Sequence, residues 1–271
     1  LQSGVIKEII VISDGSTDNT VSILRSIKDS RLIVVDRKKR VGLNQTQNEI
    51  AKRAKNDILV MLDADILPKD SLFLEKLIVP LLEDENIGIV GANTISQPSR
   101  NLLERILVNS HELKQFMYSR IKGGNNVYMC HGRARAFSRK LYKKIIWPDN
   151  CSEDAYSYFF CVANGFKFIF NNEASVLFRS PSKLTGHIAQ SNRFIYGKKT
   201  LEEYFDPGFV RREYVIPKNL MLKTILFFLL KNPISTPLYM ILNMYIRLLK
   251  SQEPIHHSKY EVSPTSKNVI V

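Results

Sequence analysis

The sequence predicts an α/β fold, a mostly parallel sheet flanked by helices and followed by C-terminal interfacial helices. Three observations lead to this prediction. Short apolar runs of strand length alternate with amphipathic stretches of helix length along the first 100 residues. One run, Ile58–Leu62, is hydrophobic at every position, as expected of a strand covered on both faces. With 271 residues and 44% hydrophobic content, the chain can also bury a full core.

Each strand of the first half is bounded by polar residues and followed by a helical pattern. The strand that ends at Ser13 leads into a polar turn, whose Ser16 or Asp18 can cap the next helix. Such alternation predicts parallel strands with helices on both faces. Gly91 in the fourth strand leaves room for a close backbone approach. The predicted strands span residues 8–13, 31–36, 58–62 and 87–95, and the predicted helices span 20–30, 43–55, 71–82 and 99–121.

The second half begins with a mixed basic and apolar stretch. Residues 133–137 are predicted to form a strand, with a helix after it. A further helix begins at Ser152, the predicted N-cap, and ends before Gly165. Two short strands, 167–170 and 175–178, and another helix follow. That last helix carries Gln190, Arg193 and Phe194 on one face.

Two carboxylates stand at the end of the Ile58–Leu62 run. Asp63 and Asp65 are two residues apart, so in extended backbone they point to the same side. Ligands of open α/β sheets bind at the carboxyl ends of strands, and carboxylate oxygens suit Mg²⁺ or Mn²⁺. The pair therefore predicts a metal site that bridges a nucleotide diphosphate, and a solvated loop is the alternative.

Three further charged residues are candidate ligand contacts. Asp14, like Asp63, lies at the carboxyl end of a predicted strand, although an Asp that forms a turn needs no ligand. Arg133 and Arg135 alternate onto one strand face, where they could meet phosphate or form a solvated basic edge.

The acids Glu153 and Asp154 in the first turn of their helix have two interpretations. Helix capping explains acids at this position. A carboxylate there, followed by aromatic residues that shield it from water, is also well placed as a general base.

Charge and cysteine content narrow the classes of partner. Residues 1–99 hold 13 Lys and Arg against 14 Asp and Glu, whereas residues 100–271 hold 26 against 12. A basic surface suits nucleic acid, anionic lipid or phosphorylated substrates. Nucleic acid is disfavoured because the aromatic residues cluster in apolar helices. Three cysteines without close-spaced pairs indicate core residues in a reducing compartment, not disulfides or a zinc site.

Four sequence blocks follow one another in a specific order. They are DGSTD at residues 14–18, LDAD at 62–65, SED at 152–154 and QSNRF at 190–194. Together they resemble the family-2 glycosyltransferases of GT-A fold, which transfer a sugar from a nucleotide diphosphate to an acceptor. QSNRF is similar to the QxxRW element of the polysaccharide-synthase branch. The resemblance covers residues 5–200.

The resemblance implies a role for each matching residue. Asp63 would contact the ribose or the metal, and Asp65 the metal, which is Mg²⁺ or Mn²⁺. Asp154 would be the base that deprotonates the acceptor hydroxyl, and Arg193 would neutralise the leaving diphosphate. An inverting displacement on a nucleotide-diphosphate sugar, with UDP-sugar as the first choice, and a saccharide or lipid-linked acceptor follow. The implied nucleotide-sugar contacts are Asp14, Asp63, Arg133 and Gln190.

The sequence departs from the family pattern at two places. Phe194 stands where QxxRW has Trp, which weakens a role in stacking on the acceptor. Members of the family also begin with a strand and helix before the DGS turn, and here that unit of roughly 30 residues is absent. We therefore expect the sequence to begin inside a domain and to bind nucleotide poorly as it stands.

The C-terminal segment is strongly apolar but interrupted. Lys231-Asn232-Pro233 and Pro237 divide residues 220–249 into pieces shorter than the roughly 20 residues that cross a bilayer. Two helices in the membrane interface, with Lys and Arg toward anionic headgroups, fit better than a helical cap on the domain. The predicted units are a GT-A catalytic domain over 1–215, this apolar segment over 216–250 and a disordered tail over 251–271.

Three function classes follow from these observations. The first is a glycosyltransferase in the cytoplasm, associated with the inner face of the cell membrane. The second is a basic nucleic-acid-binding protein, and the third is a truncated, inactive scaffold that keeps the fold.

Overall fold

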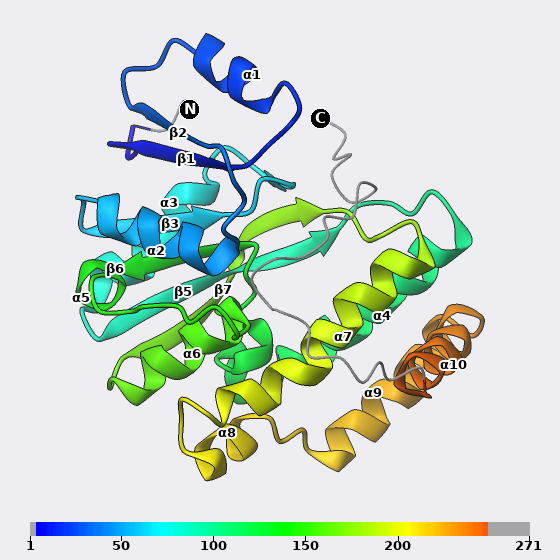
Figure 1. The fold of residues 1–271 in the computed structure, drawn as a ribbon. Helices are drawn as coiled ribbons and strands as arrows, with labels where there is room; N and C mark the ends of the chain where they lie inside the picture. Colours follow the sequence, from blue (N-terminus) through cyan, green and yellow to red (C-terminus); the bar gives the residue numbers. More distant parts are fainter. Residues whose placement is uncertain (1–3, 249–271) are drawn as a thin grey trace.

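The computed structural model describes residues 4–248, with all their side chains except those of residues 189, 190 and 192–198. The predicted tail, 251–271, lies outside this range. A two-stranded sheet lies beside a five-stranded mixed sheet, with helices around them (Figure 1). The strands are β1 Ile9–Asp14, β2 Leu32–Arg37, β3 Ile58–Leu62, β4 Ile66–Pro68, β5 Ile87–Ser96, β6 Ala134–Ser138 and β7 Lys167–Phe178. The helices are α1 Thr20–Ser26, α2 Leu43–Arg53, α3 Phe73–Glu83, α4 Leu102–Tyr118, α5 Arg139–Tyr142, α6 Glu153–Ala163, α7 Leu184–Leu201, α8 Pro207–Glu213, α9 Lys218–Lys231 and α10 Ser235–Leu248, with short 3₁₀ turns at Lys122–Gly124 and Val127–Met129.

The first sheet consists of β1 and β2, which pair in parallel. Helix α1 ends at Ser26, four residues before the predicted end, because Ile27 has an extended backbone. Within the described residues β1 pairs with β2 alone and β3 with β6 alone, so each has one edge without a neighbouring strand. The expected absence of a family strand and helix stays a prediction.

The second sheet has the order β3-β6-β5-β7-β4. Strands β3, β5 and β7 run in one direction, and β6 and β4 run in the opposite direction. The predicted parallel neighbour of β3 is therefore wrong, since β6 pairs with it in antiparallel register, Leu62 opposite Ala134. The chain leaves β5 through α4 and re-enters the sheet at the carboxyl end of β3, which reverses the direction of β6.

Two apolar clusters cover the two faces of this sheet. Ile89 and Phe137 point into one cluster, which includes α6, and Val90 and Ala136 point into the other, which includes α3. This alternation follows from the two-residue period of a strand. The three cysteines are buried free thiols within the first cluster, in agreement with their prediction as core residues.

Strand β7 is one element where the sequence analysis predicted two. Its pairing with β5 shifts between Ala92, opposite Asn171, and Asn93, opposite Ser175. A bulge therefore absorbs the polar residues between the two apolar runs, and the strand continues. Gly91 allows the predicted close backbone approach, because a Cβ there would lie 3.1 Å from the carbonyl oxygen of Met129.

Helices α9 and α10 pack on α4, away from the sheet (Figure 1). The chain breaks between them at Asn232-Pro233, as predicted, whereas Pro237 lies in the first turn of α10, where proline is tolerated. Lys231, expected at lipid headgroups, forms an ion pair of 2.9 Å with Glu112. Among the described residues, no helix is long and apolar enough to cross a bilayer.

Candidate active site

The carboxyl end of β3 carries the two acids of the LDAD block. Asp63 directly follows β3, and its backbone N–H donates to the carbonyl of Arg133 at 2.9 Å. Asp65 stands in the turn between β3 and β4. Burial, and then the charge of Asp65, raise the pKa of Asp63. Two repelling carboxylates partly removed from water would be stabilised by a cation. Their role as metal ligands stays a prediction.

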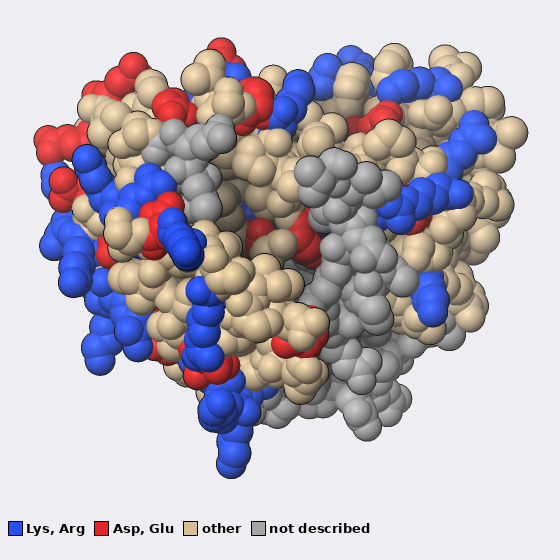
Figure 2. Space-filling view, turned by 90° about the horizontal axis from the view of Figure 1, so that it is seen from above, with Lys and Arg blue, Asp and Glu red and all other residues tan. Residues whose placement is uncertain are grey.

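Arg133 lies beside these acids, one residue before β6. Its guanidinium stands over the ring of Phe178, with Cζ 3.8 Å from the ring centroid. Burial lowers the pKa of Arg133, whereas Asp63, Asp65 and Asp154 raise it. The guanidinium therefore stays charged at neutral pH and can meet an anionic ligand. In a view from above, acidic side chains lie at the bottom of a hollow (Figure 2).

Arg135 is part of the core, so neither of its two predicted alternatives, a phosphate contact or a solvated basic edge, is correct. The side chain is completely buried. Its Nη1 donates to Oγ of Ser157 at 2.9 Å, and its Nη2 lies 3.6 Å from Oε1 of Glu153. Nε1 of Trp147 donates to the same Ser157 oxygen at 2.8 Å. Because β6 lies between β3 and β5, it offers no solvated edge, and α6 covers the face that carries Arg135.

The two acids at the start of α6 have different surroundings. Glu153 is buried beside Arg135, and Gly132 packs directly against its carboxylate. Burial, and then the charge of Asp154, raise the pKa of Glu153. Asp154 instead lines a cavity. Two consecutive residues of α6 are thus a core acid and an acid that a ligand can reach.

The hydrogen bonds of Asp154 leave one carboxylate oxygen available. Oδ1 accepts from Oγ of Ser152 at 2.6 Å and from the backbone N–H of Ala155 at 2.7 Å. Oδ2 accepts no hydrogen bond from the described residues. Ser152 is the N-cap residue of α6, as predicted, although its hydroxyl donates to Asp154 and makes no capping hydrogen bond to the helix.

The cavity beside Asp154 has a volume of about 910 Å³ and extends to the C-terminal helices. Arg133 and Asp154 line one part of it, and residues of α4, α7, α9 and α10 are among those that line the other parts. Its size falls within the range of small-molecule sites. An acceptor bound in the cavity would therefore reach Asp154 directly.

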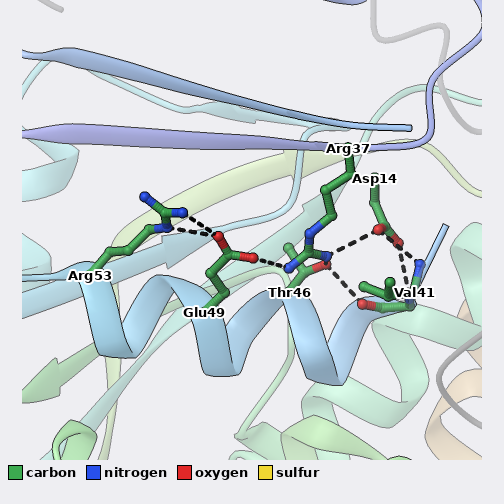
Figure 3. A network of polar contacts seen from close by, with 7 residues as sticks. Asp14, Arg37, Val41, Thr46, Glu49 and Arg53 are labelled. Atoms are coloured by element: carbon green, nitrogen blue, oxygen red, sulfur yellow. Dashed lines mark hydrogen bonds and ion pairs between the residues drawn. The ribbon is translucent and has the colours of Figure 1, made fainter. Parts of the chain in front are cut away.

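Asp14 belongs to a network of charges that runs along α2 (Figure 3). Its Oδ1 accepts from Nη1 of Arg37 and from the N–H of Val41, each at 3.0 Å, and its Oδ2 accepts from the N–H of Gly42 at 2.8 Å. Burial raises the pKa of Asp14, but these donors outweigh it and lower the pKa. Arg37 continues the network to Glu49. The contacts favour a turn-forming role, and the nucleotide contact stays a prediction.

The remaining predicted site residues lie on α7. The side chains of Gln190, Arg193 and Phe194 lie outside the described residues, so their predicted roles stay predictions. Ser191 from the same block lines the cavity.

Comparison with known proteins decides the family. Residues 2–146, more than half of the chain, match the family model described as "Glycosyl transferase family 2". The chain belongs to glycosyl transferase family 2. In this glycosyltransferase Asp14, Asp63, Asp65 and Arg133 lie within the matched region. Asp154 lies beyond it, so its assignment depends on the resemblance and the geometry.

Two further comparisons place the glycosyltransferase among known proteins. Poly-beta-1,6-N-acetyl-D-glucosamine synthase of Staphylococcus aureus, in strains COL and MSSA476 among others, is 33% identical over 102 residues. That match covers 37% of this chain and 24% of the synthase, so the chain spans about a quarter of the length of these relatives. The mannosyltransferase PcManGT from Pyrobaculum calidifontis, solved with GDP-Man and Mn²⁺, has a TM-score of 0.55 at 19% identity. The likeness covers 90% of this chain and 67% of that one, and it shows the GT-A fold.

Sequence reasoning missed three features of the glycosyltransferase site. His131 lines the cavity, and its Nε2 is buried without a hydrogen-bond partner among the described residues. Gly132 makes room for Glu153, and Glu153 pairs with Arg135. The His131-Gly132 pair shortly before β6 was the available signal for the first two features. The ion pair joins β6 and α6, which no local sequence pattern relates.

Proposed function

We propose that this chain forms the catalytic part of an inverting glycosyltransferase that uses a nucleotide-diphosphate sugar. One observation carries the proposal: Asp63, Asp65, Arg133 and Asp154 interact around one site, next to a cavity. The GDP-Man bound by the archaeal mannosyltransferase supports such a donor. The staphylococcal synthase, by its name, supports a saccharide acceptor.

The residues present fit a divalent cation that is only partly held by protein. The described residues contain no group of three or more His, Cys, Asp or Glu side chains placed to hold a metal ion. Asp65 and Asp63 would therefore supply two carboxylates, and diphosphate and water would supply the remaining ligands, as Mg²⁺ and Mn²⁺ commonly accept. When bound, the metal would neutralise charge on the leaving diphosphate. The Mn²⁺ of the archaeal mannosyltransferase supports this assignment.

The proposed reaction is a single displacement. The acceptor hydroxyl oxygen attacks the anomeric carbon on the face opposite the diphosphate, and the carbon–oxygen bond to the diphosphate breaks with its electron pair on the leaving group. The hydroxyl proton passes to Oδ2 of Asp154, the carboxylate oxygen that no described residue occupies. Arg133 compensates charge on the departing diphosphate. Arg193 is proposed for the same role.

The surface of α9 and α10 supports an anionic membrane as a partner. Leu222, Leu226, Leu230, Ile241 and Leu248 are large apolar side chains exposed on these two helices. An apolar face with basic residues beside it is typical of helices that lie in a membrane interface. We propose that the enzyme works at the inner face of the cell membrane, and this apolar surface supports contact with a membrane.

Calorimetry with UDP and GDP tests the donor site. We expect heat of binding with Mn²⁺ and none with EDTA, because Asp63 and Asp65 repel a diphosphate that carries no metal.

Asp65→Ala should remove the effect of Mn²⁺. Asp70→Ala is the matched control, since Asp70 is an exposed acid nearby that pairs with Lys76 at 2.9 Å. Nucleotide binding of equal strength with Mn²⁺ and with EDTA would contradict the proposed metal site. Failure of both nucleotides to bind would favour the inactive scaffold.

A further inference from the structure

The cavity beside Asp154 has two chemically different ends. At β6 and α6 the lining is polar and includes Arg133 and Asp154. At the C-terminal helices the lining is mostly apolar, and Asn243 and Arg247 of α10 are its polar members. The residues of this apolar end are Met221, Ile225, Tyr239, Met240 and Met244.

The apolar end of the cavity reaches the protein surface at α10. Met240 and Met244 line the cavity and are also 45% and 60% exposed. Ile241 on the same helix is 58% exposed but does not line the cavity. The cavity therefore meets the surface at Met240 and Met244, beside the outer apolar face of α9 and α10.

The polar end of the cavity contains an unused hydrogen-bonding atom. Nε2 of His131 is buried and has no partner among the described residues. Burial keeps the pKa of His131 well below its usual value, so the ring is neutral and one ring nitrogen accepts a hydrogen bond while the other donates. A ligand hydroxyl at this end would supply the missing partner.

A purely polar acceptor would fill only part of this space. A free saccharide would satisfy the groups near Asp154 and leave the methionine-lined end in contact with water. Methionine side chains adapt to flexible apolar ligands. Each CH₂ group buried there would improve binding by about fourfold, from the usual free energy of burying a methylene.

We propose that the acceptor is amphipathic, with a hydroxyl-bearing head at Asp154 and a hydrocarbon portion against Met240 and Met244. The inference rests on the proposed function, because it places the head at the proposed base. It assigns the acceptor to the class of lipid-linked hydroxyl compounds, and it gives the cavity a function separate from donor binding.

The test compares two glycosides that differ only in their apolar part. Octyl β-D-glucopyranoside, below its micelle-forming concentration, and methyl β-D-glucopyranoside are titrated into the full chain with UDP and Mn²⁺ present. We expect the octyl compound to bind at least about tenfold more tightly. Met244→Ser and Met240→Ser should each reduce that preference about threefold or more. Ile241→Ser, the control on the outer face, should leave it unchanged.

The outcomes separate this inference from the proposed function. Equal affinity for the two glycosides would overturn the inference. An equal loss of preference in Ile241→Ser would also overturn it, because the octyl chain would then adsorb to the outer face. Octyl-glycoside binding that depends on Met240 and Met244, without sugar transfer from any nucleotide sugar, would keep the cavity assignment and reject the proposed function. Transfer to both glycosides with equal KM would support the proposed function and reject the cavity assignment.

Discussion

Glu153 and Asp154 are adjacent acids whose surroundings give them different properties. Glu153 lies in the core beside Arg135, with a pKa raised by burial. Asp154 faces the cavity, and its Oδ2 accepts no hydrogen bond from the residues that the structure describes. Sequence analysis left open whether these acids cap the helix or act in chemistry. The structure favours a different answer for each residue, because only Asp154 lies where a substrate can reach it.

Substitution of Asp154 tests the base directly. Asp154→Asn should lower sugar transfer by a factor on the order of 10² to 10⁴ and leave binding of UDP and Mn²⁺ nearly intact, since a base acts on the acceptor and not on the donor. Glu153→Gln should lower turnover much less. Parallel turnover assays and calorimetry on the two variants separate these effects. Transfer at the parental rate by folded Asp154→Asn would remove the base assignment.

The lowered pKa of buried His111 predicts how the free energy of unfolding depends on pH. Burial lowers its pKa to about 4, and its Nε2–H donates to the carbonyl of Thr94 at 2.8 Å. At pH values between about 4 and the ordinary pKa of about 6.5, the unfolded chain binds a proton at this histidine and the folded chain does not. His111 therefore stabilises the fold above pH 6.5, and this contribution is lost as pH falls toward 4.

His111→Gln isolates this contribution because its amide can keep the donor to Thr94. Urea titrations at pH 7 and pH 4.5 give the loss in the free energy of unfolding on acidification. We expect this loss to be smaller in the variant than in the parent, by on the order of 1–2 kcal/mol. His131 and His187 are shifted in the same direction, so part of the pH dependence remains. An unchanged pH dependence in the variant would contradict the assignment.

At the scale of elements, α9 and α10 combine two roles on opposite faces. One face packs on α4, where Nδ2 of Asn109 donates to Oγ1 of Thr236 at 3.1 Å, and the other exposes leucine and isoleucine. Both predicted interpretations, a cap on the domain and a membrane surface, are therefore compatible with one pair of helices.

Liposome flotation tests the outer face. The chain should float with vesicles that contain anionic lipid, and more weakly at high salt, since the Debye length falls from about 8 Å at physiological ionic strength to about 3 Å at 1 M. Leu226→Ser with Leu230→Ser should reduce flotation severalfold. Leu72→Ser with Leu82→Ser is the matched control, because these leucines are also exposed but lie at α3. Equal loss in both pairs would mean that α9 carries no special affinity.

At the scale of the whole molecule, local patterns predicted most elements and the position of the acids at β3. The run Ile58–Leu62 and the acids after it are contiguous, so their placement at a strand end needs no distant information. The strand β3 was wrongly predicted to pair in parallel, because its neighbour β6 comes from a segment more than 70 residues later, after α4.

Non-local contacts also account for the parts of the site that the sequence did not reveal. Arg135 looked like a phosphate ligand because its strand alternates, yet its partner Glu153 lies 18 residues away on another element. The polar residues between the two runs of β7 looked like a turn, and only the pairing with β5 makes them a bulge. The cavity depends on α4, α9 and α10 together, which no single motif describes.

The most direct test of the central claim is the configuration of the transferred sugar. The full chain, with Mn²⁺ and either UDP-α-N-acetylglucosamine or GDP-α-mannose, is incubated with octyl β-D-glucopyranoside, and the new anomeric proton is observed by NMR. Displacement with Asp154 as base predicts a β-linked product that forms only with the metal present. An α-linked product, or a product that forms equally well in EDTA, would contradict the account.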